Sequence, residues 1–385
     1  MRAIAALSLA SFASQALVRT ADTLLPQIAA DFAVSVGVAS IVITAYALTH
    51  GSMQFITGTI ADWIGKYRTV ALACGLSALT VGACGLAWSL GSLTFARFLS
   101  GATVAWILPI SLAYIGDVVP YDQRQNVLGR FLAGQVLGQL FGQAAGGVIG
   151  DYFGWRTTFF ALGAMLALAG VALAIELATN PITRPGKDVP KGRGLMESYK
   201  IVFSTPWARI MLLAVAIEGT FFQGIFSYIG ADLHLRFGVS FTGVGLIIGV
   251  FALGGLIYAA TVKPLMRRLG QAGIANCGGV LMALAFLLLA VEPSWHFAPL
   301  ATLAVGLGFY MLHNTLQTEA TQMVPAARGT SVALFASVYF LGQTTGVALG
   351  APVMDRYGAR PLFIVSAIVL PALAFWFTRR MKRKA

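Results

Sequence analysis

Long apolar stretches alternate with short polar breaks along almost the whole 385-residue chain. Each stretch is close to the length of about 20 residues that an α-helix needs to cross the hydrocarbon core of a membrane. The pattern predicts an all-α membrane protein with twelve transmembrane helices. The predicted helices are residues 4–29, 37–60, 69–89, 93–115, 127–149, 157–178, 208–231, 240–262, 272–291, 297–318, 329–350 and 360–378.

The chain contains an internal repeat, because the stretch from Gly138 to Arg156 reappears 204 residues later. Positions with the same residue in both copies include Gly138, Gln139, Gly142, Gly146, Asp151, Gly154 and Arg156. Self-similarity at one offset indicates a duplicated unit. We therefore predict two pseudo-symmetric six-helix bundles, at residues 1–178 and 208–385, joined by a cytoplasmic linker at 179–207 that is rich in proline, glycine and basic residues.

Gly138, Gly142 and Gly146 recur every fourth residue and form one stripe on the predicted helix 127–149. Such a stripe lets a second helix approach at backbone distance, although small residues at this spacing are also common in generic membrane packing. Because the stripe and its flanks occur in both halves, we expect a specific, duplicated helix contact and assign these three glycines to gating.

Composition and charge placement agree with a membrane protein. Hydrophobic residues make up 58% of the chain and charged residues only 10%. A net charge of +12 could indicate nucleic-acid binding, but most of the 26 Lys and Arg residues lie at the N-terminus, in loops on one predicted side and in the C-terminal tail. That bias marks the cytoplasmic side. We predict a bacterial inner-membrane protein with both termini cytoplasmic and no nucleic-acid partner.

The first predicted helix could also be taken for a cleaved signal peptide. We expect it to be kept, because cleavage would unbalance two halves that otherwise match. The cysteines, Cys74, Cys84 and Cys277, have no spacing typical of a disulfide framework or a metal site. We therefore expect no metal and no cofactor.

Ionisable residues within the predicted helices are functional candidates, because they are costly at membrane depth and normally face a polar cavity or a partner. Arg19 and Asp22 are three residues apart and can neutralise each other on one helix face. Arg97, in the predicted helix 93–115, lies at a depth comparable to that of Asp22. We predict that Asp22 pairs with Arg97, with Arg19 as the alternative partner.

A specific signature, Gly-Thr-Ile-Ala-Asp-Trp-Ile-Gly-Lys-Tyr-Arg, lies between the second and third predicted helices. It resembles the loop motif of the major facilitator superfamily, and the resemblance spans essentially the whole chain. In that family the motif aspartate faces the N-terminus of the eleventh helix, which implies a latch for the outward-facing state. A solvated loop charge is the alternative. The residues that the resemblance assigns to this gate are Gly58, Asp62, Gly65, Lys66 and Arg68.

Two further stretches are similar to motifs of the same family. Arg97 and Gly101 resemble the second motif, in which a membrane-embedded arginine serves proton coupling, and this implies proton coupling for Arg97 together with Asp22. The glycine stripe resembles the antiporter motif that is associated with exporters. Gln143 stands where that motif usually has proline, so the match is incomplete at this position.

Glu218 is the acid that we place nearest the bilayer middle. The stretch from Arg236 to Ser240 echoes that from Asp31 to Ser35, which aligns the predicted helix 208–231 with the first helix. Burial disfavours the charged form of a carboxylate, so Glu218 is expected to hold a proton for much of the time. We predict that it is a second titrating group, for which a cationic substrate can substitute. The alternative is that Glu218 is bonded to a neighbouring helix and only holds the bundle together.

Polar and aromatic side chains in the other predicted helices are candidate substrate contacts. His313 can bind substrate, carry protons or bond to neighbouring helices. Phe222 and Phe226 can line an apolar cavity, or can form packing surface. The predicted substrate-binding residues are Arg19, Tyr46, Gln135, Gln139, Phe222, Phe226, His313, Asn314, Gln317, Tyr339 and Gln343.

These features predict a secondary transporter whose two bundles rock around a midplane site, and not an enzyme. The branch resembled is the twelve-helix drug and metabolite efflux group, which implies export of a small, amphipathic molecule in exchange for protons. The alternative is a proton-coupled importer or uniporter of a sugar or organic acid. A membrane enzyme or a receptor belongs to a different class, but the sequence has no nucleophile arrangement or attached domain for either. We expect a monomer that interacts with the substrate, protons and the bilayer.

Overall fold

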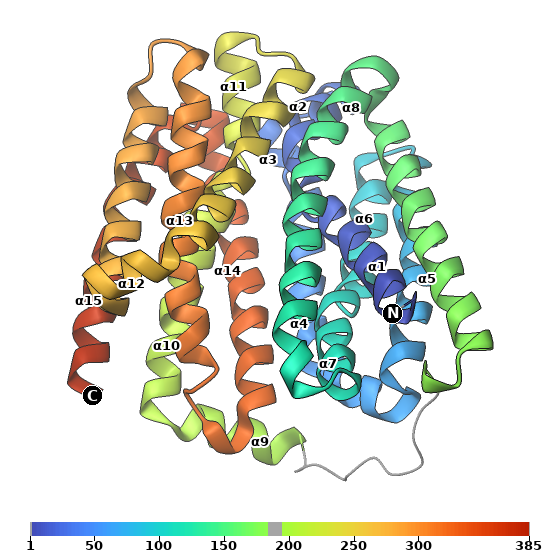
Figure 1. Cartoon of the computed structure of the whole chain (residues 1–385). Helices are drawn as coiled ribbons and strands as arrows, with labels where there is room; N and C mark the ends of the chain where they lie inside the picture. The colour runs from blue at the N-terminus through green and yellow to red at the C-terminus, as the bar shows by residue number, and fades with distance from the viewer. Residues whose placement is uncertain (1, 184–194, 385) are drawn as a thin grey trace.

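The computed structural model describes residues 2–183 and 195–384, and these residues are nearly all helical (Figure 1). The predicted all-α class is therefore confirmed. We call the end at which the chain passes from the N-terminal to the C-terminal half the linker end, at the bottom of Figure 1, and the opposite end the far end. Within the described ranges, the side chains outside the description are those of residues 58, 59, 62, 121, 122, 125, 126, 182, 195, 383 and 384.

The helices of the N-terminal half are α1 (Arg2–Val18), α2 (Thr20–Asp31), α3 (Val36–Ala39), α4 (Ile41–Ile64), α5 (Lys66–Gly85), α6 (Leu90–Val104), α7 (Ile107–Val118) and α8 (Tyr121–Thr179). Those of the C-terminal half are α9 (Leu195–Ser204), α10 (Pro206–Glu218), α11 (Ile229–Phe237), α12 (Phe241–Val291), α13 (Ala298–Ala320), α14 (Arg328–Tyr357) and α15 (Arg360–Lys384). A π-helical turn at Gly219–Gly224 follows α10, and 3-10 turns lie at Pro181–Thr183, Trp295–Phe297 and Pro325–Ala327.

Several helices that the sequence predicts as continuous are divided in the structure, and two of these breaks concern the site described below. The first is divided at Arg19 into α1 and α2, which bend by 41° relative to each other. The seventh changes after Glu218 into the π-helical turn at Gly219–Gly224. Single π-helical turns are frequent at functional sites. Both breaks lie beside buried ionisable side chains, which are described below.

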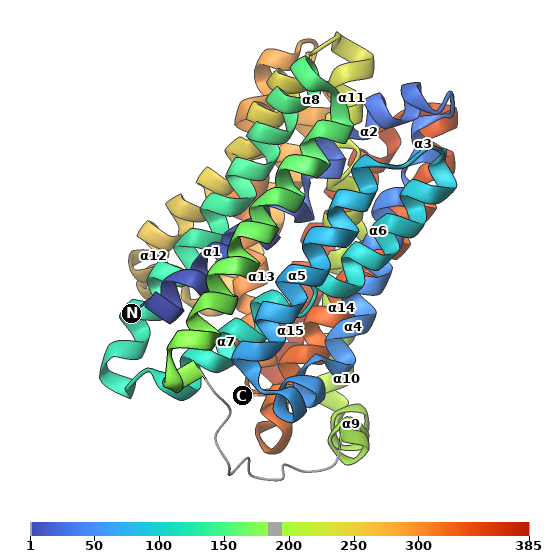
Figure 2. The same ribbon diagram turned by 90° about the vertical axis from the view of Figure 1, so that its right-hand side faces the viewer.

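Helices α8 and α12 are longer than one membrane crossing requires, at 59 and 51 residues. Each contains one glycine in a non-helical conformation, Gly154 with φ 81° and Gly270 with φ 63°. Residues with a side chain rarely adopt such positive φ values, so glycine permits the chain to turn there. Figure 2 shows the ribbon of α8 turning back on itself at the far end.

In the described part of the chain, nine helical stretches are long and apolar enough to cross a membrane, and ten if the bent pair α1 and α2 is one span. This is the composition of a multi-pass membrane protein. The count does not reproduce the twelve predicted helices, because Val127–Thr179 and Phe241–Val291 each count as one stretch.

The duplicated glycine stripe is a close helix contact in both halves. A Cβ atom added to Gly142 in α8 would overlap the backbone carbonyl of Ala16 in α1. At the repeat position of Gly142, a Cβ atom on Gly346 in α14 would overlap the backbone carbonyl of Thr220 in the π-helical turn, and one on Gly342 would lie 2.6 Å from the carbonyl oxygen of Ala216 in α10. Helix α8 thus packs on α1, and α14 on α10, at backbone distance. The predicted duplicated contact is confirmed.

Candidate functional site

Buried polar side chains join the two halves of the chain beside the breaks in the first and seventh predicted helices. Arg19, which is 1% exposed, donates from Nη1 to Oδ2 of Asp22 at 3.0 Å. Its Nη2 donates to Oε1 of Gln223, which lies in the π-helical turn. The hydroxyl of Tyr339 in α14 donates to the same oxygen at 2.6 Å. An arginine of the N-terminal half is thus held by acceptors from both halves, as a buried charge requires.

Asp22 pairs with Arg19, and the predicted pairing of Asp22 with Arg97 is wrong. No ion pair of Arg97 is found among residues 2–183 and 195–384. Its Nε donates to the carbonyl of Val42 at 3.3 Å, and its Cζ lies 4.1 Å from the ring centre of Tyr46. Its Nη1 is buried without a hydrogen-bond partner. Comparable depth in two different helices does not by itself make two side chains pair. A spacing of three residues along the chain brings Arg19 and Asp22 within pairing distance.

Glu218 and His313 form the second pair of ionisable side chains in the site. Oε2 of Glu218, whose side chain is fully buried, lies 2.8 Å from Nδ1 of His313 in α13. The other carboxylate oxygen, Oε1, is buried without a partner. The two groups can share one proton, as a carboxylic acid beside a neutral imidazole or as a carboxylate beside an imidazolium. The sequence indicates each residue separately, but the pairing was missed.

Aromatic rings surround this pair. The imidazole of His313 lies 4.7 Å from the ring of Phe309 and 4.9 Å from that of Tyr339, between centroids. The rings of Phe222 and Phe309 stack with their centroids 4.3 Å apart. Cζ of Arg19 lies 4.3 Å from the ring centre of Phe226. The structure therefore brings both predicted phenylalanines to the cluster. Phe309 was missed, because a phenylalanine in a long apolar helix gives no signal that separates a site from a lipid-facing surface.

The remaining predicted substrate contacts divide by burial. Tyr46, Tyr339 and Gln343 are buried. Partly or fully exposed are Gln135, Gln139, Asn314 and Gln317, and no hydrogen bond joins these four to the cluster in the part of the chain that the structure describes. The ring of Tyr46 lies 5.4 Å from that of His50, which in turn lies 4.2 Å from the ring of Phe340 in α14. Through His50, helix α4 therefore also contacts the C-terminal half.

At the far end, two aspartates of the repeat cap helices of the opposite half. The carboxylate of Asp151 in α8 accepts hydrogen bonds from the backbone N–H groups of Phe241 at 3.0 Å and Thr242 at 2.6 Å, where α12 begins. The first N–H groups of a helix lack partners within it, and the helix dipole favours a negative charge there. Asp151 thereby ties the N-terminal half to the C-terminal half.

Asp355 makes the symmetry-related contact in the opposite direction. Its carboxylate accepts from the N–H of Gly37 and from the hydroxyl of Ser35, both at 2.7 Å, where α3 begins. Tyr228 adds a third link, because its hydroxyl donates to the carbonyl of Val347 at 2.7 Å and lies 3.1 Å from Oγ of Ser40. Figure 1 shows α2, α3, α11 and the turn of α8 gathered at this end. The two halves are therefore joined at the far end. The sequence repeat identifies both aspartates but does not indicate their partners.

The predicted gate at the linker end is described only in part, because the surroundings of Gly58 and the side chain of Asp62 lie outside the description. Helix α4 ends at Ile64, and Gly65 has φ 98°, so the motif glycine forms the expected tight turn. Lys66 forms an ion pair with Asp117 of α7, a partner that was missed. Arg68 is exposed.

Known proteins resemble the chain in sequence along most of its length. The model of the Major Facilitator Superfamily matches residues 7–347. An uncharacterized MFS-type transporter of Bacillus subtilis (strain 168), YceJ, is 28% identical over 332 residues, 85% of this chain and 82% of the relative. A probable sugar efflux transporter of Pasteurella multocida (strain Pm70) is 27% identical over 368 residues, 92% of this chain and 87% of the relative.

Solved structures show the same fold at low sequence identity. A bacterial homolog of the human lysosomal transporter Spinster, in an inward-facing and occupied conformation, has a TM-score of 0.77 at 18% identity and covers 98% of this chain and 96% of its own. The nucleoside transporter NupG has a TM-score of 0.75 at 15% identity and covers 99% of this chain and 100% of its own. At these identities the likeness shows the fold alone.

Proposed function

The chain belongs to the Major Facilitator Superfamily, and on this premise we propose that it exports a small molecule across the membrane in exchange for protons. Its family and fold are those of transporters and not of enzymes. The observation that carries the proposed exchange is the pair of Glu218 and His313, bonded at 2.8 Å, with the Glu218 side chain fully buried and one of its carboxylate oxygens lacking a partner. Such a pair accepts either a proton or a donor group of the substrate.

Competition for this pair is the proposed basis of coupling. A substrate cation or donor group that binds Glu218 stabilises the carboxylate and so lowers the affinity for the proton, and by linkage the proton lowers the affinity for the substrate equally. Tyr339 extends the effect, because its ring lies 4.9 Å from that of His313 while its hydroxyl holds Gln223, the acceptor for Arg19. A change of charge at His313 is therefore transmitted to the contact between the two halves.

The surroundings of the pair support an amphipathic substrate. Phe222 and Phe309 present apolar ring surface next to the buried acid Glu218. Sites for small molecules are mostly apolar with a few placed polar groups. The relative named as a probable sugar efflux transporter supports export as the direction.

A proton-coupled importer or uniporter of an organic acid is the second candidate, and Arg97 favours it. Among the described residues this buried arginine forms no ion pair, and its Nη1 has no hydrogen-bond partner. The hydroxyl of Tyr46, whose ring lies under the guanidinium, is also buried and unpaired. A substrate carboxylate can satisfy both donors with charge-assisted hydrogen bonds.

The proposed architecture has twelve crossings in two six-helix bundles, at residues 1–178 and 208–385, with the linker at 179–207. Helices α8 and α12 then each cross twice, because their 59 and 51 residues exceed twice the length of about 20 residues that one crossing needs. The basic residues of the tail and of the linker-end loops support cytoplasmic termini, and a monomer in a bacterial inner membrane is part of the same proposal. Reporter fusions at Gly192, which lies outside the described residues, and after Lys384 should both be cytoplasmic.

Alternating access requires gates at both ends. We propose that Asp151 and Asp355 latch the far end, and that the loop from Gly58 to Arg68 latches the linker end when the far end opens. The polar contacts between the halves at the far end support a state that is closed at that end. Gly138 and Gly142 hold α1 against α8, and Gly146 holds α2 against α8, during this movement.

Transport by purified protein in proteoliposomes tests the proposed role of the pair. The solute is the compound with the largest thermal shift in a screen of lipophilic cations, sugars and organic acids, because a ligand stabilises the state that it binds. Glu218→Gln should abolish exchange driven by a pH gradient while retaining solute counterflow, which needs no proton step. The matched control is Glu319→Gln, on α13, whose carboxylate accepts from Gln271 at 3.3 Å outside the cluster. Full gradient-driven exchange by Glu218→Gln would exclude the pair from coupling.

A further inference from the structure

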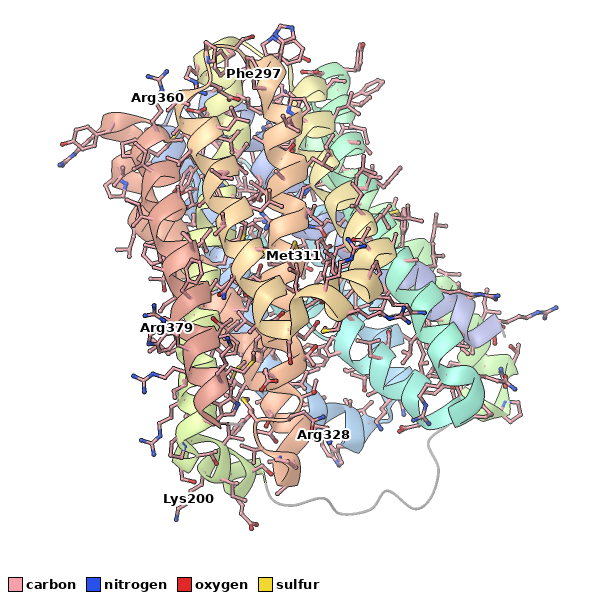
Figure 3. All side chains as sticks on the ribbon, turned by 60° about the vertical axis from the view of Figure 1, so that its left-hand side comes forward. Lys200, Phe297, Met311, Arg328, Arg360 and Arg379 are labelled. Carbon is pink, nitrogen blue, oxygen red and sulfur yellow. The ribbon has the colours of Figure 1, made fainter. Side chains whose placement is uncertain are left out.

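An apolar groove of about 750 Å³ opens on the surface of the C-terminal half. Its walls come from α12 on both sides of Gly270, from α13 and from α15. Residues that line it include Leu265, Leu269, Val280, Leu284 and Phe375, of which Leu284 is 60% exposed. Figure 3 shows this side of the molecule, with Met311, another lining residue, near the centre. In a multi-pass membrane protein, such a surface contacts lipid chains.

Basic side chains lie at the linker end of two walls of this groove. Arg268 follows the lining residue Leu265 by three positions, and Arg379 follows Phe375 by four, so each arginine shares a helix face with the groove. Both are exposed, and no ion pair of either is found within residues 195–384. Figure 3 shows Arg379 on α15 well below Arg360, toward the linker end. Two uncompensated cations therefore flank one end of an apolar surface.

Asn276, near the start of the second part of α12, supplies an amide among the apolar lining residues. Its Oδ1 accepts a hydrogen bond from the hydroxyl of Thr378 in α15 at 2.9 Å. The amide then has only its N–H groups to offer a ligand. These donors suit an ester or phosphate oxygen, and they lie between the walls that carry Arg268 and Arg379.

We propose that this groove binds an anionic phospholipid. One acyl chain lies along the apolar walls, the phosphate lies between Arg268 and Arg379, and the glycerol ester lies near Asn276. The apolar walls accept the chain of any lipid, but the two arginines favour a headgroup with a net negative charge. Basic pockets between transmembrane helices are known to bind anionic headgroups in this way. The lipid would fasten α15 to α12 and so stabilise the C-terminal half.

Native mass spectrometry of the delipidated full chain tests the proposal. The probes are phosphatidylglycerol and phosphatidylcholine with identical palmitoyl and oleoyl chains, titrated separately. We expect the first phosphatidylglycerol adduct at roughly tenfold lower lipid concentration than the first phosphatidylcholine adduct. The variant Arg268→Gln/Arg379→Gln should lose this preference, whereas Arg268→Lys/Arg379→Lys should keep most of it, because the charges remain. Equal binding of the two lipids by the unmodified chain would overturn the proposal.

The matched control removes two positive charges from the same helices but not from the groove. Lys263 is two positions from the lining residue Thr261, and Arg380 is five from Phe375, so both lie on other helix faces. Lys263→Gln/Arg380→Gln should retain the preference for phosphatidylglycerol. If it loses the preference as fully as Arg268→Gln/Arg379→Gln does, net charge and not the groove selects the lipid, and the proposal is wrong.

A groove-filling variant locates the acyl chain independently of charge. Val280→Trp places a large side chain at a lining position that is 40% exposed, so the fold has room for it. It should abolish the preferred phosphatidylglycerol adduct while both arginines remain. Retention of that adduct at unchanged concentration would place the lipid elsewhere on the surface and contradict the proposed site.

Discussion

Replacing Asp151 and Asp355 by alanine should open the far end of the molecule. Each carboxylate accepts two hydrogen bonds from the start of a helix in the opposite half, at 2.6 to 3.0 Å for Asp151 and 2.7 Å for Asp355. Loss of such a cap costs about 0.5–2 kcal/mol. Both aspartates are exposed, so screening keeps each value near the lower end, about 0.5–1 kcal/mol.

The two caps lie in different helix pairs with no shared partner, so their effects should add. The double variant should then lose about 1–2 kcal/mol of the free energy that favours the closed far end, which raises the ratio of open to closed molecules about 5–30-fold. Each single variant should produce about half of the free-energy change. The population of the open state should rise, because the caps form only when the two halves meet and therefore stabilise only the closed state.

Distances between spin labels measure this ratio directly. Labels on cysteines at Phe153 and Tyr357, each 70% exposed, in a Cys277→Ser background, report the separation of the halves at the far end. Asp31→Ala is the matched control, because Asp31 is an acid at the same end that accepts from Arg156 and Trp155 of its own half. A ratio that changes less than twofold in the double variant, or that changes equally in Asp31→Ala, would refute the latch.

Three further predictions concern packing, charge burial and pH. Gly142→Leu should abolish transport while the protein still inserts, because its side chain would collide with the Ala16 carbonyl; Gly134→Leu, where nothing lies within 4 Å of an added Cβ, should transport normally in the same flux assay. Arg19→Met should lower the free energy of unfolding by about 3–5 kcal/mol, since it leaves the buried Asp22 unpaired; Arg97→Met should cost clearly less in the same thermal-unfolding assay, and equal losses would contradict the assigned pairing. Burial raises the pKa of Glu292 to about 7, against the opposing effect of Arg236. The folded state then keeps a proton that the unfolded state releases, so stability should fall as pH rises from about 4.5 to 7; Glu292→Gln should flatten Tm across this window, and an unchanged slope would show that another group titrates.

The helical class, the repeat and the glycine contact are predictable, because apolar periodicity and small-residue spacing are local properties of a sequence. The stripe at Gly142 predicts a close helix contact in each half, and the structure places Ala16 against Gly142 and Thr220 against its repeat position, Gly346. The spacing of three residues between Arg19 and Asp22 likewise indicates that these two side chains can pair with each other. The side chains that share one face of a helix can be predicted from the sequence.

Contacts between helices far apart in the chain could not be predicted. Glu218 and His313 lie 95 residues apart, and their pairing depends on which faces of α10 and α13 meet. The repeat displays Asp151 and Asp355 as equivalent, but their partners begin helices of the opposite half. The π-helical turn that positions Gln223 arises in a segment whose composition is ordinary for a membrane helix. Each of these features depends on tertiary packing.

Uptake into proteoliposomes under a pH gradient of either sign tests the claim of proton exchange most directly, because the sign of the effect does not depend on how the protein is inserted. The solute is the compound selected by the thermal-shift screen. Exchange predicts that it accumulates when the vesicle interior is more acidic than the exterior, since protons then leave as the solute enters, and that the accumulation disappears in Glu218→Gln. Accumulation only when the exterior is the more acidic side, or uptake that ignores both gradients, would contradict the account.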